Sequence, residues 1–181
     1  MKATKILAGL AVLALVLARP GFTASKAVNE PVWIGPTVRT TAYTHSENAG
    51  ERWAKLNAIE TPLRAEVAYT SAAADWSRFP LGTKFRIAGE PTIYVIDDYG
   101  SALVGTNTID IYRPTRGSMD AWGVRLVNIE ILELGDFERS LSVLASRLKH
   151  PWCKRMHDAI GERLRTPDKT TSPQLIQPTA Q

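Results

Sequence analysis

Three aspartates stand at points where short β-strands should turn or end, and they are the residues best suited to acid–base chemistry. Asp75 lies shortly before a Pro-Leu-Gly-Thr turn, Asp98 follows an apolar run, and Asp110 is flanked by isoleucine on both sides. Burial and neighbouring carboxylates both raise the pKa of a carboxyl group. A carboxyl group that keeps its proton near neutral pH is suited to general acid catalysis.

Asp110 is the most informative of the three. A carboxylate inside a short apolar strand is costly unless it is paired, hydrogen-bonded or protonated. Side chains alternate along a strand, so Asp110 is expected to share a face with Thr108 and Tyr112 and to oppose Ile109 and Ile111. The alternation indicates a carboxyl group exposed on one face of a strand whose other face is apolar.

An aspartate in a turn more commonly caps a backbone amide, and this interpretation stays open for each of the three. The Asp-Tyr-Gly sequence at residues 98–100 is ordinary turn chemistry. Asp97 and Asp98 are adjacent, so in a strand they point to opposite faces, and only one of them can join a shared cluster.

The elements that must position these residues are short strands followed by helices. Helical spacing replaces β-type patterns after Gly135, and Pro151 separates two helical segments. Strands first and helices last, without alternation, predict an all-β domain, a small barrel or sandwich, with a helical appendage. The expected strands are residues 38–44, 65–71, 83–88, 92–96, 108–112 and 123–134.

The first 27 residues predict export. Lys2 and Lys5 precede an apolar run at residues 6–18, and small residues follow it, which is typical of a cleaved secretory signal peptide. A retained N-terminal anchor is the alternative, although this run is shorter than the roughly 20 residues that cross a bilayer. Residues 28–37 are expected to be a linker. The mature protein is then expected in the periplasm or cell envelope, with association with the outer membrane as a further option.

The charge of the chain argues against nucleic acid as a partner. Four of the 22 basic residues lie in residues 1–27, which contain no acidic residue, so 18 basic face 18 acidic residues in the remainder. Nucleic-acid binding needs a basic surface on the folded domain. Cys153 is the single cysteine, so no intramolecular disulfide can form, and a buried or idle thiol is expected. The histidines show no metal-ligand spacing, and no metal or other cofactor is expected.

These motifs together resemble the 3D (three-aspartate) domain, which is found in the lytic transglycosylase A group and in stationary-phase survival proteins. The resemblance covers about residues 38–134. It is carried by Ala74-Asp75 with residues 80–83, by residues 98–102 with Gly105, by residues 109–112, and by the opening and closing motifs at 41–43 and 122–124.

The resemblance implies a six-stranded double-psi β-barrel over residues 38–134. Helical spacing predicts the helices at 135–165, and a Pro-, Thr- and Gln-rich composition predicts a disordered tail at 166–181. Asp75, Asp98 and Asp110 would converge in one groove, with Asp110 as catalytic acid/base and the other two supporting it. The implied function is a lytic transglycosylase that cleaves peptidoglycan glycan strands and forms a 1,6-anhydro product. A non-catalytic, expansin-like glycan-binding module is the alternative.

The expected substrate-binding residues surround these aspartates. They are Tyr99, Thr41, Tyr43, Lys84 and Trp76. For the aromatic residues, which include Trp122 and Tyr112, a place in the core is the alternative, because they bury large areas. A solvated strand lysine is the alternative for Lys84. The expected partner is a glycan strand, without nucleic acid or nucleotide, and the protein is expected to be a monomer.

The sequence departs from the family in two places. Tyr99-Gly100-Ser101 stands where Thr-Gly-Gly commonly follows the second aspartate, which restricts the turn. Only about 25 residues separate Tyr43 from Val67, so the large insert domain of the transglycosylase A group is missing.

Overall fold

The computed structural model describes residues 33–48 and 52–166. The predicted signal peptide (1–27), the first part of the predicted linker and all but the first residue of the predicted tail (166–181) lie outside the described residues. No helix within the described ranges is both long enough and apolar enough to span a bilayer.

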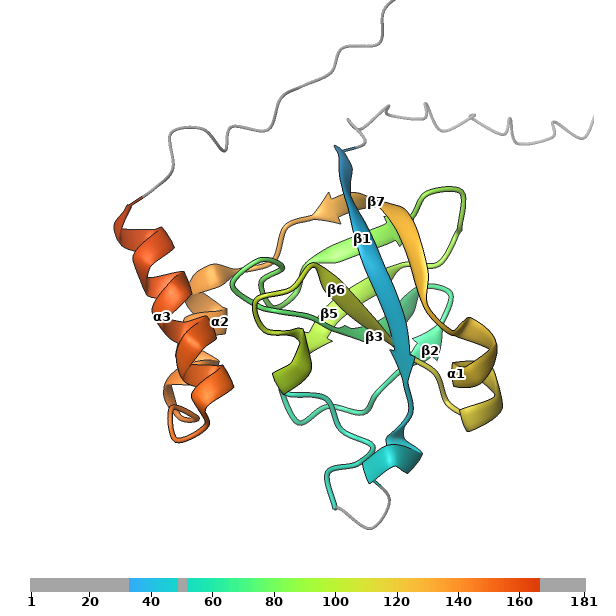
Figure 1. The fold of residues 1–181 in the computed structure, drawn as a ribbon, viewed down its shortest axis with the longest axis horizontal. Helices are drawn as coiled ribbons and strands as arrows, with labels where there is room; N and C mark the ends of the chain where they lie inside the picture. The colour runs from blue at the N-terminus through green and yellow to red at the C-terminus, as the bar shows by residue number, and fades with distance from the viewer. Residues whose placement is uncertain (1–32, 49–51, 167–181) are drawn as a thin grey trace, which may run out of the picture.

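The described chain is mostly β-sheet, as the succession of short β-type runs predicted (Figure 1). The seven strands are β1 (Trp33–Tyr43), β2 (Ala65–Glu66), β3 (Tyr69–Ala73), β4 (Lys84–Ile87), β5 (Tyr94–Asp98), β6 (Thr108–Tyr112) and β7 (Arg125–Glu133). They form one mixed sheet in the order β2-β3-β5-β4-β7-β1-β6, and β6 also pairs with β3.

Three α-helices and two short 3-10 helices complete the described fold. They are α1 (Arg116–Trp122), α2 (Phe137–Ala145), α3 (Pro151–Arg165), η1 (His45–Asn48) and η2 (Ser101–Leu103). Thr115 and Ser118 form a capping box at the start of α1, and the Asp136 side chain accepts the Arg139 amide at the start of α2. The helices after Gly135 are therefore present, with α2 and α3 packed together beside the sheet (Figure 1).

Strand β3 holds a central position for the site. It pairs in parallel with β5 on one side and antiparallel with β6 on the other. A register shift between Ala72 and Ala73 makes Ala73 the partner of Asp98, although Ala72 pairs with Ile96. Asp97 is the extra residue of this irregularity, which allows Asp98 to share a face with Ala73.

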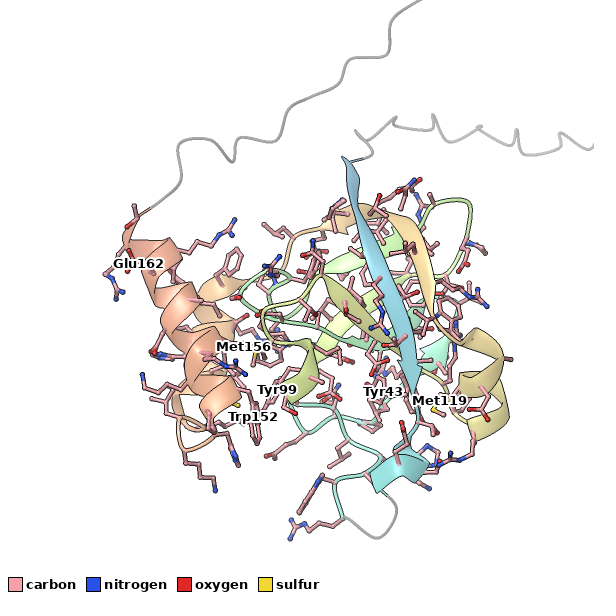
Figure 2. The ribbon with its side chains drawn as sticks, viewed as in Figure 1. Tyr43, Tyr99, Met119, Trp152, Met156 and Glu162 are labelled. Atoms are coloured by element: carbon pink, nitrogen blue, oxygen red, sulfur yellow. The ribbon has the colours of Figure 1, made fainter. Side chains whose placement is uncertain are left out.

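The core is continuous from the sheet to the C-terminal helices. Trp76, Leu144, Met156 and Ile160 are fully buried in one cluster, and the Trp76 amide lies 3.4 Å from the Met156 sulfur. Figure 2 shows Met156 on α3 facing the sheet. The helices therefore share the core of the β-sheet.

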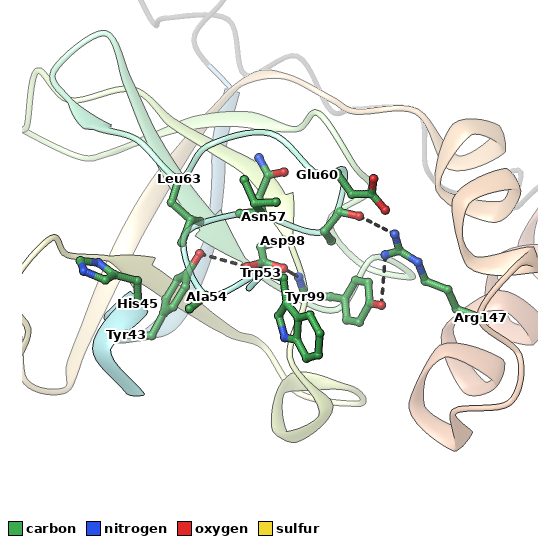
Figure 3. A pocket seen from close by; sticks show the side chains of 12 residues that line it. Tyr43, His45, Trp53, Ala54, Asn57, Glu60, Leu63, Asp98, Tyr99 and Arg147 are labelled. Atoms are coloured by element: carbon green, nitrogen blue, oxygen red, sulfur yellow. Dashed lines mark hydrogen bonds between the residues drawn. The ribbon is translucent and has the colours of Figure 1, made fainter. Parts of the chain in front are cut away.

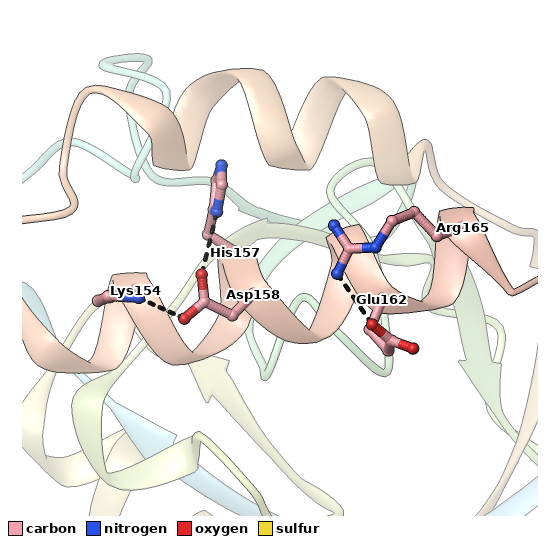
Figure 4. Close-up of polar contacts among 5 residues, drawn as sticks. All are labelled: Lys154, His157, Asp158, Glu162 and Arg165. Carbon is pink, nitrogen blue, oxygen red and sulfur yellow. Dashed lines mark hydrogen bonds and ion pairs between the residues drawn. The ribbon is translucent and has the colours of Figure 1, made fainter.

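The outer face of α3 carries exposed ion pairs. Lys154 pairs with Asp158 and Arg165 pairs with Glu162, and His157 Nδ1 lies 3.5 Å from Asp158 Oδ1 (Figure 4). Exposed pairs of this kind add little stability because water screens them. The buried face of α3 therefore accounts for its packing.

Candidate functional site

A pocket of about 450 Å³ opens beside the end of β5. Its walls come from the end of β1, the segment 53–63, the turn after β5, and Arg147 in the connection between α2 and α3 (Figure 3). The lining residues are Tyr43, His45, Trp53, Ala54, Leu56, Asn57, Ala58, Glu60, Leu63, Asp98, Tyr99 and Arg147.

Two carboxyl groups line this pocket, the exposed Glu60 and the largely buried Asp98. Asp98 Oδ1 accepts the Tyr99 amide at 2.9 Å, and Asp98 Oδ2 accepts the Tyr43 hydroxyl at 3.2 Å. Burial raises the pKa of Asp98 to about 7; the negative charge of Asp97 adds to this, and the hydrogen bonds from Tyr99 and Tyr43 work against it. Asp98 therefore exchanges a proton with solvent near neutral pH.

Asp110 is half-buried on β6, and the groups around it explain the direction of its pKa shift. The Thr41 hydroxyl donates to Asp110 Oδ1 at 2.7 Å. Burial raises the pKa of Asp110 above its ordinary value, Thr41 opposes this, and the charge of Glu47 adds to it. The flanking Ile109 and Ile111 are fully buried, and Thr108 and Tyr112 are buried as well, so Asp110 is the most accessible residue of β6.

Asp98 and Asp110 flank the same residue of β3. Ala73 pairs with Asp98 across β5 and with Asp110 across β6. Because paired residues share a face, both carboxyl groups project on one side of the sheet, with α-carbons about 10 Å apart from two strand spacings. Burial raises the pKa of Tyr43 well above its ordinary value, and the charges of Asp98 and Asp110 both add to this. The structure therefore brings two of the three aspartates into one region.

Asp75 is placed differently. It is almost fully buried, and it does not line the pocket. Its Oδ1 accepts the amide and the hydroxyl of Ser77, and its Oδ2 accepts the Gly105 amide at 2.6 Å. Asp75 thus connects the turn after β3 to the loop before β6. Such capping is the alternative that the sequence left open for each aspartate.

Three of the expected substrate-binding residues lie near the two carboxyl groups. Tyr43 and Tyr99 line the pocket, and Thr41 contacts Asp110. Burial raises the pKa of Tyr99 to about 12, so its hydroxyl remains neutral and can donate a hydrogen bond.

The other two expected substrate-binding residues, Trp76 and Lys84, do not line the pocket. Trp76 lies in the core and Lys84 is a solvent-exposed strand lysine, as the alternatives for them stated. Trp76 is fully buried, and its indole Nε1 donates to the main-chain oxygen of Asp98 at 2.9 Å. Trp76 is therefore not accessible to a sugar, and it stabilises the backbone at Asp98 through this hydrogen bond. Lys84 is exposed on β4 and forms an ion pair with Glu133 at 2.6 Å, outside the pocket lining.

Trp122 and Tyr112 are also buried outside the pocket lining. The guanidinium groups of Arg113 and Arg125 lie 4.2 and 4.0 Å from the centre of a Trp122 ring. The Tyr112 hydroxyl bonds to His45 Nδ1 at 2.8 Å.

Two pocket residues carried no signal in the sequence. Trp53 lies in a polar segment expected to be a loop, and Arg147 belongs to the last turn of a helical pattern. Arg147 donates to the Tyr99 hydroxyl at 3.2 Å and to the Ala58 carbonyl at 2.7 Å. For Trp53, the available hint was a tryptophan within an otherwise polar segment. For Arg147 there was none, because the sequence does not show that two segments about 90 residues apart lie close together.

A buried network fixes the segment that walls the pocket. Asp97 Oδ2 accepts hydrogen bonds from Ser71, Asn57 and Tyr69 at 2.7, 2.9 and 3.1 Å. Asn57 Oδ1 in turn accepts the amides of Ile59 and Thr61. Asp97 therefore fixes the wall of the pocket, whereas Asp98 lines the pocket itself.

Within the described residues, no group of three or more histidine, cysteine or acidic side chains is arranged to hold a metal ion.

Comparison with models of protein families finds a match within this chain. The model of the 3D domain matches residues 70–133. This part of the chain is similar to the 3D domain. All three aspartates lie in the matched range, whereas Tyr43, the segment 53–63 and Arg147 lie outside it. 3D domains are found in peptidoglycan-active proteins. A search of curated proteins finds no match.

Proposed function

We propose that this chain is an exported lytic transglycosylase that cleaves the β-1,4 bond between N-acetylmuramic acid and N-acetylglucosamine in peptidoglycan. The proposal rests on Asp98 and Asp110, two carboxyl groups with raised pKa on one face of the sheet, one of them lining a pocket. Pairs of carboxyl groups whose surroundings separate their pKa values are a common basis of acid–base catalysis.

Asp98 is the proton donor in this scheme. Its pKa of about 7 leaves a large protonated fraction at neutral pH, which general acid catalysis requires. The proton goes to the glycosidic oxygen, and the bond from that oxygen to the anomeric carbon breaks. The 6-hydroxyl oxygen of the same muramic acid then bonds to the anomeric carbon, giving a 1,6-anhydro sugar without consuming water.

Asp110 accepts the proton that the 6-hydroxyl group releases. The resemblance to the transglycosylase A group implies Asp110 as the acid/base, and the geometry supports a division of labour with Asp98. The Thr41 hydrogen bond favours the ionised form of Asp110. Asp75 contributes by holding the Gly105 loop that precedes β6.

The proposal includes the expected six-stranded double-psi β-barrel, formed by every strand of the seven-stranded sheet except β2. The support is the pairing of β6 with β3, through Ala72–Ile111 and Ala73–Asp110, in addition to its pairing with β1. This pairing joins β6, the last strand in the sheet order, to β3, the second strand in that order. It places Asp110 beside β3.

Export and the cell wall as partner complete the proposal. The basic, apolar and small-residue succession in residues 1–27 supports secretion to the periplasm or cell envelope. The 3D domain supports a peptidoglycan glycan strand as the ligand of the monomer.

The test is digestion of purified sacculi followed by analysis for 1,6-anhydro muropeptides. Asp98→Asn and Asp110→Asn should each lower product formation by about a hundredfold or more, the usual range for loss of a general acid or base. Asp120→Asn, an exposed carboxyl group on α1, is the matched control and should retain activity.

Full activity in Asp110→Asn would show that Asp110 has no catalytic role. Full activity in both variants would show that catalysis does not depend on the two carboxyl groups. A wild-type protein that binds sacculi without releasing anhydro products would contradict catalysis and favour the expansin-like binding module.

A further inference from the structure

We propose that Trp53 and Arg147 form a subsite, within the same pocket, for a sugar that carries a carboxylate. This inference rests on the proposed function, because it names the kind of glycan that the pocket selects. Both residues lie outside the matched 3D domain, so the subsite would be a feature of this chain rather than of the domain.

Trp53 provides an apolar platform at the pocket. Its side chain is 58% exposed, although it lines the same pocket as Asp98 and Tyr99 (Figure 3). An indole combines a large flat apolar face with one N–H donor, and such residues are enriched where ligands bind. The apolar face of a pyranose ring fits that flat surface.

Arg147 provides a positive charge that is already held in place. Its Nη1 bonds to the Tyr99 hydroxyl and its Nη2 to the Ala58 carbonyl, and its guanidinium lies 5.8 Å from the Tyr99 ring centre. These bonds use two of the five N–H donors of a guanidinium group. In the described part of the chain, Arg147 forms no ion pair.

The arrangement separates this charge from the carboxyl group proposed as the acid. The Tyr99 amide bonds to Asp98, whereas the Tyr99 hydroxyl bonds to Arg147, so the tyrosine lies between the two groups (Figure 3). Glu60, the other acidic lining residue, is exposed, so solvent screens its charge. A ligand carboxylate is therefore stabilised at the Arg147 end and disfavoured at the Asp98 end, which orients the glycan.

A charge-assisted bond to a pre-positioned guanidinium is stronger than a neutral one and loses little side-chain entropy. In peptidoglycan the carboxylate has two sources. One is the lactyl group of a muramic acid without a stem peptide, and the other is the stem peptide itself. Both share the chemistry that Arg147 recognises.

The experiment measures equilibrium binding by calorimetry in the Asp110→Asn background, which prevents cleavage. Three ligands are compared: an N-acetylglucosamine tetramer, which is neutral; a peptidoglycan tetrasaccharide without stem peptides; and the same tetrasaccharide with them. At least one anionic ligand should bind about tenfold more tightly than the neutral tetramer. Added salt should reduce this preference.

The variants separate charge from platform. Arg147→Gln should abolish the preference for the anionic ligand, and Arg147→Lys should keep part of it, because lysine retains the charge without the planar fork. Trp53→Ala should lower the affinity for all three ligands by a similar factor. Arg155→Gln and Leu126→Ala, exposed residues outside the pocket lining, are the matched controls. Thermal unfolding of each variant checks that the fold is intact.

Equal affinity of the starting protein for all three ligands would overturn the subsite and leave the proposed function standing. An anionic preference that persists in a folded Arg147→Gln protein would also overturn it. Absence of binding to every ligand would overturn both the subsite and the proposed function.

Discussion

Asp98 illustrates how a single residue can serve a site at the expense of the fold. Its carboxyl group is largely withdrawn from water, next to the buried side chain of Asp97. Hydrogen bonds from the Tyr99 amide, the Tyr43 hydroxyl and the Ala58 backbone compensate its charge only in part. Ionising such a group in the folded state costs free energy. The same cost is what retains the proton that the proposed reaction uses.

The first prediction concerns the free energy of unfolding as a function of pH. The folded protein holds a proton on Asp98 up to a pKa of about 7, whereas the unfolded chain releases it near 3.8. Stability should therefore fall as pH rises from about 4 to above 7, by up to roughly 4 kcal/mol from this one group. Asp98→Asn cannot ionise, so it should be more stable than wild type at about pH 8.5 and similar at about pH 4.

Urea unfolding at both pH values measures the difference. Asp120→Asn, which removes an exposed carboxyl group, should follow the wild type at each pH. An Asp98→Asn protein that is no more stable than wild type at the higher pH would show that Asp98 does not hold its proton in the fold.

Residue chemistry was readable from sequence only where local pattern decides it. Alternation in a strand predicted that Asp110 opposes Ile109 and Ile111, and the structure buries both isoleucines fully while Asp110 is half-buried. The difference between Asp75, which caps Ser77 and Gly105, and Asp98, which faces a pocket, depends on contacts distant in sequence. Trp53 and Arg147 were missed for the same reason.

At the scale of elements, turns and strand ends determine how the site is built. The β-rich fold and the later helices followed from hydrophobic period. The pairing of β3 with both β5 and β6 did not, because register across a sheet is set by long-range packing. That pairing is what places two carboxyl groups beside Ala73.

The connection from β7 to α2 leaves no room for a side chain. A β-carbon at Gly135 would lie 2.4 Å from the Pro80 carbonyl oxygen and 2.5 Å from the Leu81 oxygen and the Thr83 nitrogen. The Gly135 amide also donates a hydrogen bond to the Thr83 hydroxyl oxygen at 3.0 Å. This glycine therefore allows the sheet and the helices to approach through the Pro-Leu-Gly-Thr turn.

The second prediction is that Gly135→Ala destabilises the protein by about 1–3 kcal/mol or more, because backbone atoms must move. Gly117→Ala is the matched control: nothing lies within 4 Å of its β-carbon position, and it is within α1. It should be neutral or stabilising by up to about 1 kcal/mol. Thermal unfolding compares the two; equal stability of both variants would contradict the close packing at Gly135.

At the scale of the whole molecule, the C-terminal helices are part of the structure that supports the site. Cys153, Met156 and Ile160 on α3 are fully buried in the same cluster as Trp76, which itself bonds to the main chain of Asp98. Arg147, between the helices, reaches the pocket wall through Ala58. The sequence indicated an amphipathic helix but not which surface it covers, since that depends on how the chain folds back.

The third prediction follows from this shared core. Met156→Ala should lower the free energy of unfolding by about 2–5 kcal/mol, because it removes a fully buried side chain and leaves a cavity beside Trp76. Leu164→Ala, at a position of α3 that is 41% exposed, should have a much smaller effect. If helices and sheet form one cooperative unit, far-ultraviolet circular dichroism and tryptophan fluorescence should report a single transition that shifts together in Met156→Ala. Loss of the helical signal at a lower denaturant concentration than the fluorescence signal would instead show that α2 and α3 unfold independently of the domain that carries Asp98 and Asp110.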